Sequence, residues 1–559
     1  MTTAMNKIYK GILSMAFAAF VLSGCNAFLD TTPSDRISDK MTWTRKEYVD
    51  LYVNNFYEYL SVYGQFGSQQ FNGSITEGLT NTFKYGSVSP GSAAGDANDY
   101  VFYPEKLQPS GSLLDIWSST YIRIRRINEF LDAMNVHSTF SDEVNTLYEA
   151  QARFFRAYLY FQLAKRHTQG TDNGGLILYT TLQMKKDTPL SSAADVWQLI
   201  YDDLDFASKN LPEAWGPSNN GRITSYGAYA FMSRAMLYAE RWEDAKNAAD
   251  MVINSGKYSL TADYADAYKG SNTESIVQFA YNGVSGPSHN FDKNYVPYGD
   301  YLMVGSDEYG GKGTPTQEMV EYYETKDGKT IDWSEWHGTT KNNPPFDQLE
   351  PRFHATILYP GSEWKGNKIL PTEMGTNGRF MQYGAENYAN GRTTTGYYLR
   401  KLVDESHAKD LITVGGSHTW VEVRLAEVYL NRAEAIYRIG GNDAGARADI
   451  NTVRARVNLP ASRIDDTFEA IRHERLIELA YEGHLYWDMR RWKLAHTEYN
   501  NYRCHGLKVT GPDFEDKYKW EYVDCDTKDR KFLEKMYILP VPTSETNNNK
   551  AAEQFNEWK

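Results

Sequence analysis

Cysteine is scarce in this chain of 559 residues, which contains three, namely Cys25, Cys504 and Cys525. Three cysteines are too few to hold a fold together by disulfides, and no close spacing of Cys and His residues predicts a zinc site. Cys504 and Cys525 are close enough in sequence to form one disulfide outside the cytoplasm, or they can remain thiols. The fold is therefore expected to depend on a hydrophobic core, with at most one disulfide bond.

Long hydrophobic runs are also missing after the first two dozen residues, which excludes membrane-spanning helices from the rest of the chain. Basic residues do not dominate either, because 59 Lys and Arg face 72 Asp and Glu and give a net charge of -13. An acidic surface repels polyphosphate, so no nucleic-acid partner is expected. Hydrophobic residues at 41% and charged residues at 23% are instead typical of a folded globular protein.

Enzyme motifs are absent as well, since the sequence has no HExxH, GxSxG or GxxxxGKS/T pattern and no EF-hand loop. The stretch Gly310–Gly313 is rich in glycine, but it follows no strand–helix frame and is interpreted as a flexible loop. No catalytic residue, cofactor or metal is predicted. A chain with 72 acidic residues can still place two carboxylates at the separation that glycosidases use. A secreted helical glycoside hydrolase therefore remains an alternative.

The first residues have the pattern of an export signal. Lys7 and Lys10 precede an apolar stretch that ends at Leu22, and Ser23-Gly24-Cys25 follows. This order is typical of a secretory signal peptide, predicted here for residues 1–24. The segment Leu22-Ser23-Gly24-Cys25 resembles a bacterial lipobox. This resemblance implies that Cys25 becomes the lipidated first residue of the mature protein. An ordinary cleaved signal with an incidental cysteine is the alternative.

Apolar residues recur every three to four positions in two blocks, about 113–256 and 419–495, which predicts a helical scaffold. After an apolar stripe between Ile116 and Leu131, the predicted helices of the first block cover 141–166, 192–211, 224–240 and 242–254. Those of the second block cover 421–439, 444–457, 467–481 and 485–494. The fold class is therefore expected to be mainly α.

A short pattern repeats within these helices. The frame Ala-x-x-x-Arg-Ala-x-x-Tyr occurs twice, and a looser copy occurs once, with the arginine at Arg156, Arg234 and Arg432. Small residues at this spacing let helices pack closely, as in helix-hairpin repeats of the tetratricopeptide kind. We interpret the arginines as salt-bridged packing residues between repeats and not as a ligand site.

Two other stretches, about 63–111 and 257–416, lack helical periodicity and are rich in glycine, asparagine and aromatic residues. Ser275–Phe279 alternates as a strand does. Long irregular segments in folded proteins are usually functional. The chain also has 42 Tyr and 13 Trp, whose rings join an apolar face to a polar group and suit hydrated ligands. These stretches, together with short β segments, are predicted to form a ligand-binding face.

The C-terminal part carries the most specific pattern, with ERLIELAYEGH from Glu474, WDMRRW from Trp487 and LPVP from Leu539. With CNAFLD from Cys25 and NGRIT from Asn220, these segments resemble SusD-like (SusD/RagB) outer-membrane lipoproteins over essentially the whole mature chain. His484 stands where that family often has arginine. The resemblance implies a single domain, 25–559, whose C-terminal segment is 496–559.

The resemblance also implies a fold and partners. Four tetratricopeptide-like helix pairs are expected to support the irregular binding face. The protein is expected to be anchored by lipid at the cell surface, to bind oligosaccharides or polysaccharides, and to deliver them to a SusC-like TonB-dependent transporter. A peptide-binding member of the same family is one alternative, and a scaffold that binds only other proteins is another.

A sugar has an apolar face that an aromatic side chain can cover, and a rim of hydroxyl groups to which polar side chains can bond. Residues that combine these two features are the candidate ligand contacts. Trp333 and Trp336 form the densest aromatic group, and their replacement by Ala is expected to abolish glycan binding with little loss of stability. Glu77, Asn81 and Tyr85 are spaced by four and lie either on one helical face or in a surface turn. The full set of candidates is Glu77, Asn81, Tyr85, Tyr298, Asp300, Tyr301, Trp333, Trp336, Arg379, Arg392 and Tyr397.

Overall fold

The computed structural model of the protein describes residues 42–68, 75–85, 100–110, 114–182, 187–283, 286–297, 310–369, 393–406, 414–510, 518–526 and 528–559. The predicted signal peptide and Cys25 lie outside these residues. Among the helices of the described part, none combines the length and the apolar character needed to cross a bilayer.

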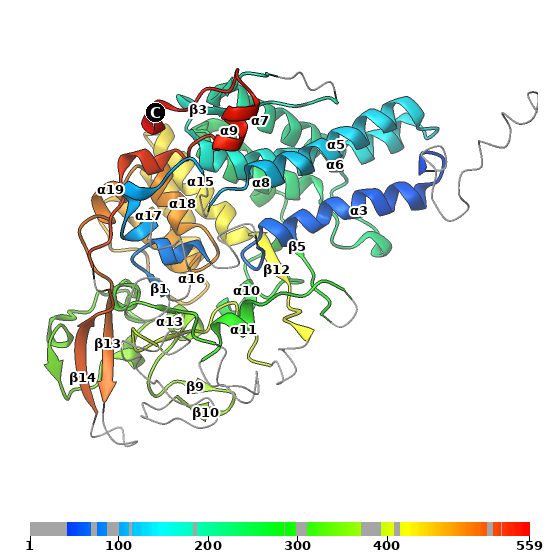
Figure 1. Ribbon diagram of the computed structural model, residues 1–559. Coiled ribbons are helices and arrows are strands. Elements are labelled where there is room, and N and C mark those ends of the chain that lie inside the picture. The colour runs from blue at the N-terminus through cyan, green and yellow to red at the C-terminus, as the bar shows by residue number, and fades with distance from the viewer. Residues whose placement is uncertain are drawn as a thin grey trace, which may run out of the picture.

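The first helical block forms a stack in which each helix packs against the next (Figure 1). Its members are α5 (Trp117–His137), α6 (Asp142–His167), α7 (Ala193–Asn210), α8 (Ser225–Tyr238) and α9 (Trp242–Asn254). An earlier helix, α3 (Lys46–Tyr63), packs against α6. The predicted helix starts are confirmed where caps define them: Ser192 Oγ accepts the Asp195 N–H at 3.1 Å, and Thr224 Oγ1 accepts the Gly227 N–H at 3.0 Å.

The second helical block continues the same stack. Helix α15 (Leu425–Ile439) packs against α9 and α8, although residues 255–424 separate it from them in sequence. The remaining helices of this block are α16 (Asp443–Ala455), α17 (Thr467–Glu478), α18 (Leu485–Arg491) and α19 (Ala495–Glu498). The mainly α fold with tetratricopeptide-like helix pairs is thereby confirmed.

One predicted helix boundary is wrong. Residues 421–424, expected to be helical, belong to strand β12 (Trp420–Arg424), which pairs antiparallel with β5 (Ser275–Phe279). All five residues of β12 are buried, and its two valines are β-branched residues that favour strands. Helix α15 begins directly afterwards at Leu425. The strand predicted for Ser275–Phe279 is confirmed, and its partner turns out to be the start of the second helical block.

The irregular stretches form the lower part of the molecule in Figure 1, where described strands are short and sheets hold two or three of them. The pairings there are β1 (Phe83–Tyr85) with β6 (Gly313–Pro315), β8 (Ile357–Leu358) with β11 (Tyr398–Leu399), β9 (Glu363–Trp364) with β10 (Asn367–Lys368), and β7 (Thr339–Thr340) with β14 (Lys519–Asp524), which also pairs with β13 (His505–Thr510). The described residues of this part also form the short helices α10 (Tyr264–Ala267), α11 (Phe291–Tyr295), α12 (Gln317–Glu321) and α13 (Pro351–Thr356).

Two further groups of short elements lie elsewhere. Strand β3 (Asn173–Leu176) pairs with β2 (Thr168–Gln169) and β4 (Ser191–Ser192) within the first helical block, and α20 (Thr543–Asn548) belongs to the C-terminal segment.

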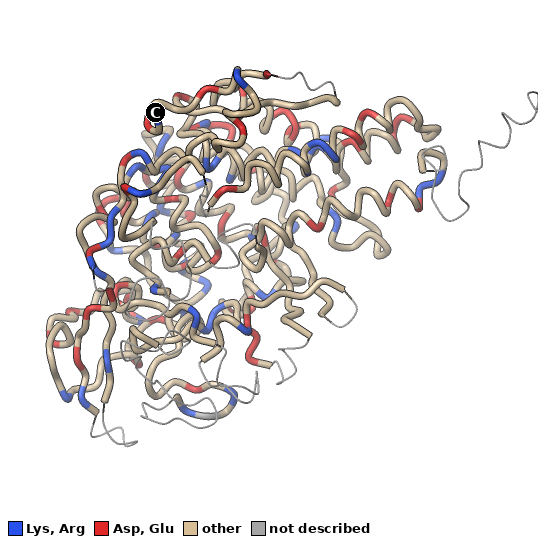
Figure 2. Tube along the Cα trace, viewed as in Figure 1, with Lys and Arg blue, Asp and Glu red and all other residues tan. Residues whose placement is uncertain are grey.

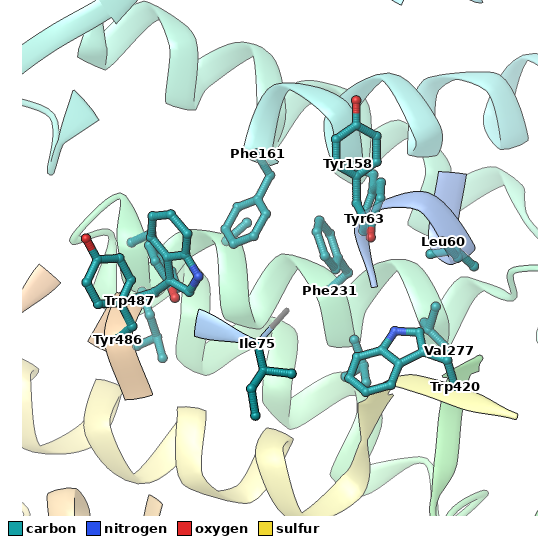
Figure 3. Packing of buried hydrophobic residues seen from close by; sticks show 14 of the residues in the cluster. Leu60, Tyr63, Ile75, Tyr158, Phe161, Phe231, Val277, Trp420, Tyr486 and Trp487 are labelled. Carbon is teal, nitrogen blue, oxygen red and sulfur yellow. The ribbon is translucent and has the colours of Figure 1, made fainter. Parts of the chain in front are cut away.

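One large aromatic core joins the helical stack to the irregular part. Phe231 of α8 lies 5.1 Å from Phe161 and 5.3 Å from Tyr158 between ring centroids, both on α6. Figure 3 shows these rings together with Trp487 of α18 and Trp420 of β12. Offset and edge-on ring pairs of this kind add to the hydrophobic gain of burial. The irregular part therefore shares one continuous core with the helical stack.

The repeated arginines are packing residues, as interpreted from the sequence. Arg156 Nε lies 2.7 Å from Asp203 of α7, and Arg234 Nε lies 2.6 Å from Glu427 of α15. Arg432 reaches Asp449 and Asp250 at 2.6 and 2.9 Å. Figure 2 shows how acidic and basic residues are interspersed along the helices. Each arginine thus joins its helix to a neighbouring element of the stack.

The two C-terminal cysteines flank the β13–β14 hairpin. The Cys525 N–H donates to the Cys504 carbonyl at 2.7 Å, so the two residues face each other across the hairpin. Both side chains are buried and are not joined by a disulfide in this structure, and burial raises the pKa of Cys504. A disulfide between them stays a prediction.

Candidate functional site

An open cavity of about 520 Å³ lies between the C-terminal end of α3 and the segment around α11. Three parts of the chain supply its walls: 61–68, Tyr281 with 287–294, and Lys312 in the glycine-rich loop before β6. The lining residues are Ser61, Val62, Gln65, Phe66, Gly67, Ser68, Tyr281, Pro287, Ser288, His289, Asn290, Phe291, Lys293, Asn294 and Lys312.

The first wall forms where α3 ends. The Gly64 N–H caps the helix by donating to the Leu60 carbonyl at 2.9 Å. A Cβ on Gly64 would come within 2.5 Å of both that carbonyl and the Trp420 ring, so only glycine fits there. The chain then turns and presents Phe66 to the cavity, while Tyr281 donates from its hydroxyl to the Ser61 carbonyl at 3.3 Å. The turn and the tyrosine together fix this wall.

The second wall is the glycine-rich loop held against α11. The Gly310 N–H donates to the Lys293 carbonyl at 3.0 Å, and the Lys312 N–H donates to the Asn294 carbonyl at 2.9 Å. Gly310 and Gly311 have φ of +88° and +56°, a backbone region that glycine enters at little cost. This conformation places Lys312 on the cavity wall, and partial burial lowers the pKa of its amine.

Rings and amides meet in this cavity. Phe66 lies 4.8 Å from Phe291 and 6.1 Å from Tyr281 between ring centroids. Asn290 is exposed and Asn294 is half-buried, and within the described part of the chain neither side-chain amide forms a hydrogen bond. An amide can both donate to and accept from a ligand. The exposed parts of Phe66 and Tyr281, 9% and 8% of each residue, thus lie beside uncommitted donors and acceptors.

Several of the sequence-predicted contacts lie outside the described residues: Tyr298, Asp300, Tyr301, Arg379 and Arg392. Tyr298 follows directly after the segment 286–297, which contributes a wall of the cavity. Their roles stay predictions.

The predicted group around Glu77 does not form one helical face. Glu77 lies in a short 3-10 helix (Thr76–Leu79), whereas Tyr85 lies in strand β1. Glu77 is buried and accepts from Gln65 Nε2 at 2.9 Å and from the Gly483 N–H at 2.8 Å. Burial raises the pKa of Glu77 despite these two bonds. Asn81 is half-buried and donates to the Tyr322 hydroxyl at 3.1 Å. The three residues hold the fold together, and none of them lines the cavity.

The other predicted aromatic contacts are mostly packed inside. Trp333 is 4% exposed and belongs to the main hydrophobic core, and Tyr397 is 1% exposed. Trp336 is half-buried, stands edge-on to Trp333 at 5.6 Å, and donates from Nε1 to the Asn342 carbonyl at 3.1 Å. These positions favour a packing role for Trp333 and Tyr397 over contact with a ligand.

We therefore expect Trp333→Ala to lower the free energy of unfolding by about 3 kcal/mol, because it removes a buried ring and leaves a cavity. This revises the sequence-based expectation of unchanged stability. Trp336→Ala, at a half-buried position, serves as the comparison and should cost clearly less. Urea unfolding of the two variants measures the difference. Equal losses, or no loss for Trp333→Ala, would show that Trp333 is not a core residue.

The cavity residues themselves were missed by sequence reasoning. A usable signal was present in Ser288–Asn294, where polar side chains flank Phe291 a few residues before the predicted contact Tyr298. Lys312 lay in the glycine-rich stretch that was interpreted only as a flexible loop. The contribution of 61–68 had no local signal, because it depends on where α3 ends in space.

Comparison with known proteins gives two family matches. Residues 273–558, just over half of the chain, match the model of the SusD family. Residues 27–237 match a model described as "Starch-binding associating with outer membrane".

Individual proteins are similar over nearly the whole chain. A SusD-like protein of Bacteroides ovatus is 23% identical, and the alignment covers 94% of this chain and 90% of that protein. A solved SusD-like structure from Bacteroides fragilis has a TM-score of 0.76 at 26% identity, covering 94% of this chain and 100% of that one. A laminarin-binding SusD-like protein has a TM-score of 0.65 at 21% identity, covering 92% and 100%.

Proposed function

The chain belongs to the SusD family, and we propose that it is a cell-surface binding protein for oligosaccharides or polysaccharides. The observation that carries this proposal is the cavity beside α11, in which aromatic rings adjoin the uncommitted amides of Asn290 and Asn294. The description of the matching family model as starch-binding and the laminarin-binding structural relative support the same class of ligand.

The chemistry of the cavity suits a sugar. A pyranose ring has apolar C–H faces that pack on an aromatic ring, and it has hydroxyl groups around its edge. Amides and a lysine amine bond to such hydroxyls directionally. Wet and shallow sites of this kind bind modestly, and we expect micromolar dissociation constants, which correspond to about 8 kcal/mol. Weak binding also permits release of the ligand to a transporter.

The wider setting of the protein is part of the proposal. We propose that lipidation of Cys25 anchors the chain to the outer membrane, and that a SusC-like TonB-dependent transporter receives the bound glycan. We propose no catalytic activity for the chain itself. Co-purification of the protein with a TonB-dependent transporter from membranes tests the partnership. Loss of a Cys25→Ala variant from the membrane fraction tests the lipid anchor.

The first test of glycan binding is affinity gel electrophoresis of the purified protein against a polysaccharide panel that includes starch and laminarin. Each incubation is also analysed for released sugars. Retardation by one polysaccharide without new products is the expected result. Release of products would favour the glycoside hydrolase alternative instead, and no retardation by any glycan would favour the peptide-binding alternative.

The cavity is tested with a double variant, Asn290→Ala with Asn294→Ala. Loss of two hydrogen-bonding amides is expected to weaken binding of the retarding glycan about tenfold, with an unchanged melting temperature. The matched control is Asn210→Ala with Asn548→Ala, two exposed amides on α7 and α20 that lie outside the cavity. Equal binding by both double variants would place the glycan elsewhere on the protein.

A further inference from the structure

Two histidines and an aspartate converge behind the cavity wall. His289 precedes α11, Asp292 lies in its first turn, and His418 lies just before β12. One donor atom from each lies within 4.8 Å of the other two. Among the described residues, this is the one group of His, Cys, Asp and Glu side chains close enough to share an ion. We infer that His289, Asp292 and His418 bind a first-row divalent metal ion such as Zn²⁺.

The backbone brings these donors together before any ion binds. His289 and Gly416 form an isolated antiparallel bridge, in which each N–H donates to the other's carbonyl, at 3.0 and 2.7 Å. This bridge places His418 two residues from the partner of His289. A Cβ on Gly416 would lie 2.3 Å from Asp292 Oδ2 and 2.7 Å from His289 Nδ1. Glycine at this position therefore allows the donors to converge.

The distances between donors are close to those of a coordination sphere. Asp292 Oδ2 lies 3.4 Å from His418 Nδ1 and 3.9 Å from His289 Nδ1. Ligands bound to Zn²⁺ at about 2.1 Å in a tetrahedron stand about 3.4 Å apart. Small rotations of the two imidazole rings are enough to bring all three donors to one ion. The fourth position is open to a water molecule, as in other sites with three protein ligands.

The carboxylate of Asp292 is prepared as a ligand. It is fully buried, and its Oδ1 accepts the Asp404 N–H at 2.7 Å, which fixes the orientation of the group. Within the described part of the chain, Oδ2 makes no hydrogen bond, although it faces both histidines. The two nitrogens of His418 likewise have no hydrogen-bond partner there. A buried, negatively charged oxygen needs a cationic neighbour, and a metal ion shared with the histidines supplies it.

The surroundings of His289 leave one of its ring nitrogens able to bind a metal ion. The Phe291 N–H donates to His289 Nδ1 at 3.2 Å, so this nitrogen carries a lone pair, and a metal bond there replaces that hydrogen bond. The Phe66 ring stacks on His289 at 4.4 Å and stands edge-on to His418 at 4.7 Å. This apolar cover lowers the local dielectric and strengthens the attraction between ion and carboxylate.

The donor set selects the class of ion. Two imidazole nitrogens with one carboxylate oxygen suit Zn²⁺ and neighbouring first-row ions, whereas Ca²⁺ takes six to eight oxygen ligands. Metal binding at these three residues fastens the segment 286–297, one wall of the cavity, to the start of β12.

The test uses the purified protein expressed without a histidine tag and freed of metal by a chelator. Calorimetric titration with Zn²⁺ is expected to show one ion bound per chain. Addition of Co²⁺ is expected to give the visible absorption of a low-coordinate site. Ca²⁺ is expected to bind at least about tenfold more weakly than Zn²⁺. His418→Gln should weaken Zn²⁺ binding at least about tenfold. His418 is partly exposed, so this variant is expected to fold even if Asp292→Asn does not.

The matched control is His337→Gln, which removes an exposed histidine beside a carboxylate of Glu321. This variant should bind Zn²⁺ as the unsubstituted protein does. The inference is overturned if the unsubstituted protein takes up no Zn²⁺, if His418→Gln binds it equally well, or if Ca²⁺ binds as tightly as Zn²⁺. These readouts do not depend on glycan binding, so they are independent of the proposed function.

Discussion

Replacement of Arg424 by Met is expected to lower the free energy of unfolding by about 3 to 5 kcal/mol, because it leaves buried carboxylates short of a partner. Arg424 is 1% exposed at the end of β12. Its guanidinium lies 2.8 Å from Glu274, 2.6 Å from Glu478 and 2.7 Å from Glu482. An arginine fork that satisfies several carboxylates at once is the geometry in which buried charges are tolerated.

The carboxylates of this cluster also have other partners, which keep most of the network in place when Arg424 is lost. Glu478 contacts Arg352 at 3.1 Å and also pairs with Arg456, and Glu482 lies 2.7 Å from Lys401. Burial would raise the pKa of Glu478, but the three arginines outweigh it and hold that pKa well below its usual range. The variant is therefore expected to fold with reduced stability.

Urea unfolding at neutral pH measures the Arg424→Met effect. The matched control is Arg125→Met, which removes an exposed arginine paired with Glu129 one turn along α5. Exposed pairs of this kind contribute well under 1 kcal/mol, so the control should be nearly neutral. A loss for Arg424→Met no larger than for Arg125→Met would show that the buried cluster does not stabilise the fold.

A fall in pH is expected to lower the free energy of unfolding, and protonation of Glu434 contributes to this loss. Glu434 of α15 is buried and bonds to both ends of the Arg491 guanidinium, at 2.5 and 2.6 Å, and to Trp492 Nε1 at 2.8 Å. Burial by itself would raise the pKa of Glu434, but the Arg491 charge and the hydrogen bonds to Arg491 and Trp492 outweigh it. They lower this pKa from 4.5 to about 2.

The sign of the effect follows from proton binding. Between about pH 4.5 and pH 2 the unfolded chain protonates this carboxyl while the folded chain does not, so stability falls as the pH falls through this window. The shift corresponds to about 3 kcal/mol, fully present above about pH 5. Denaturant unfolding between pH 6 and pH 2.5 should show the decline. Glu434→Gln should have lower stability at pH 6 and a flatter decline with falling pH. Glu129→Gln, at a partly exposed position on α5, should keep the decline of the unsubstituted protein.

The buried cluster gives a structural meaning to the most specific sequence pattern. Glu474, Glu478 and Glu482 recur every four residues in ERLIELAYEGH, and the structure turns all three toward buried arginines or Lys401. Sequence reasoning used this pattern only to identify a family. The partners of these glutamates come from β12, α13 and α16 and from the segment that contains Lys401. No local pattern could have identified those partners.

The candidate site was predicted less well than the scaffold. Rings chosen for their density, such as Trp333 and Tyr397, are mostly buried, because large aromatic residues stabilise a core as readily as they bind a ligand. Asn290 and Asn294 attracted no attention in the sequence, since single asparagines are common in loops. Their importance depends on the nearby Phe66, which lies far earlier in the sequence.

The sequence by itself determined the helices of the stack and the capped starts of α7 and α8, because periodicity and capping depend on neighbours along the chain. It also indicated that the repeated arginines are packing residues, but it did not identify their partners, which lie 17 to 193 residues away. Only the tertiary structure decided that residues 420–424 form a strand with β5, that the ends of α3 and α11 enclose a cavity, and that His289 and His418 meet at Asp292. Each of these depends on segments that lie far apart in sequence, and their meeting is fixed by the packing of the shared core.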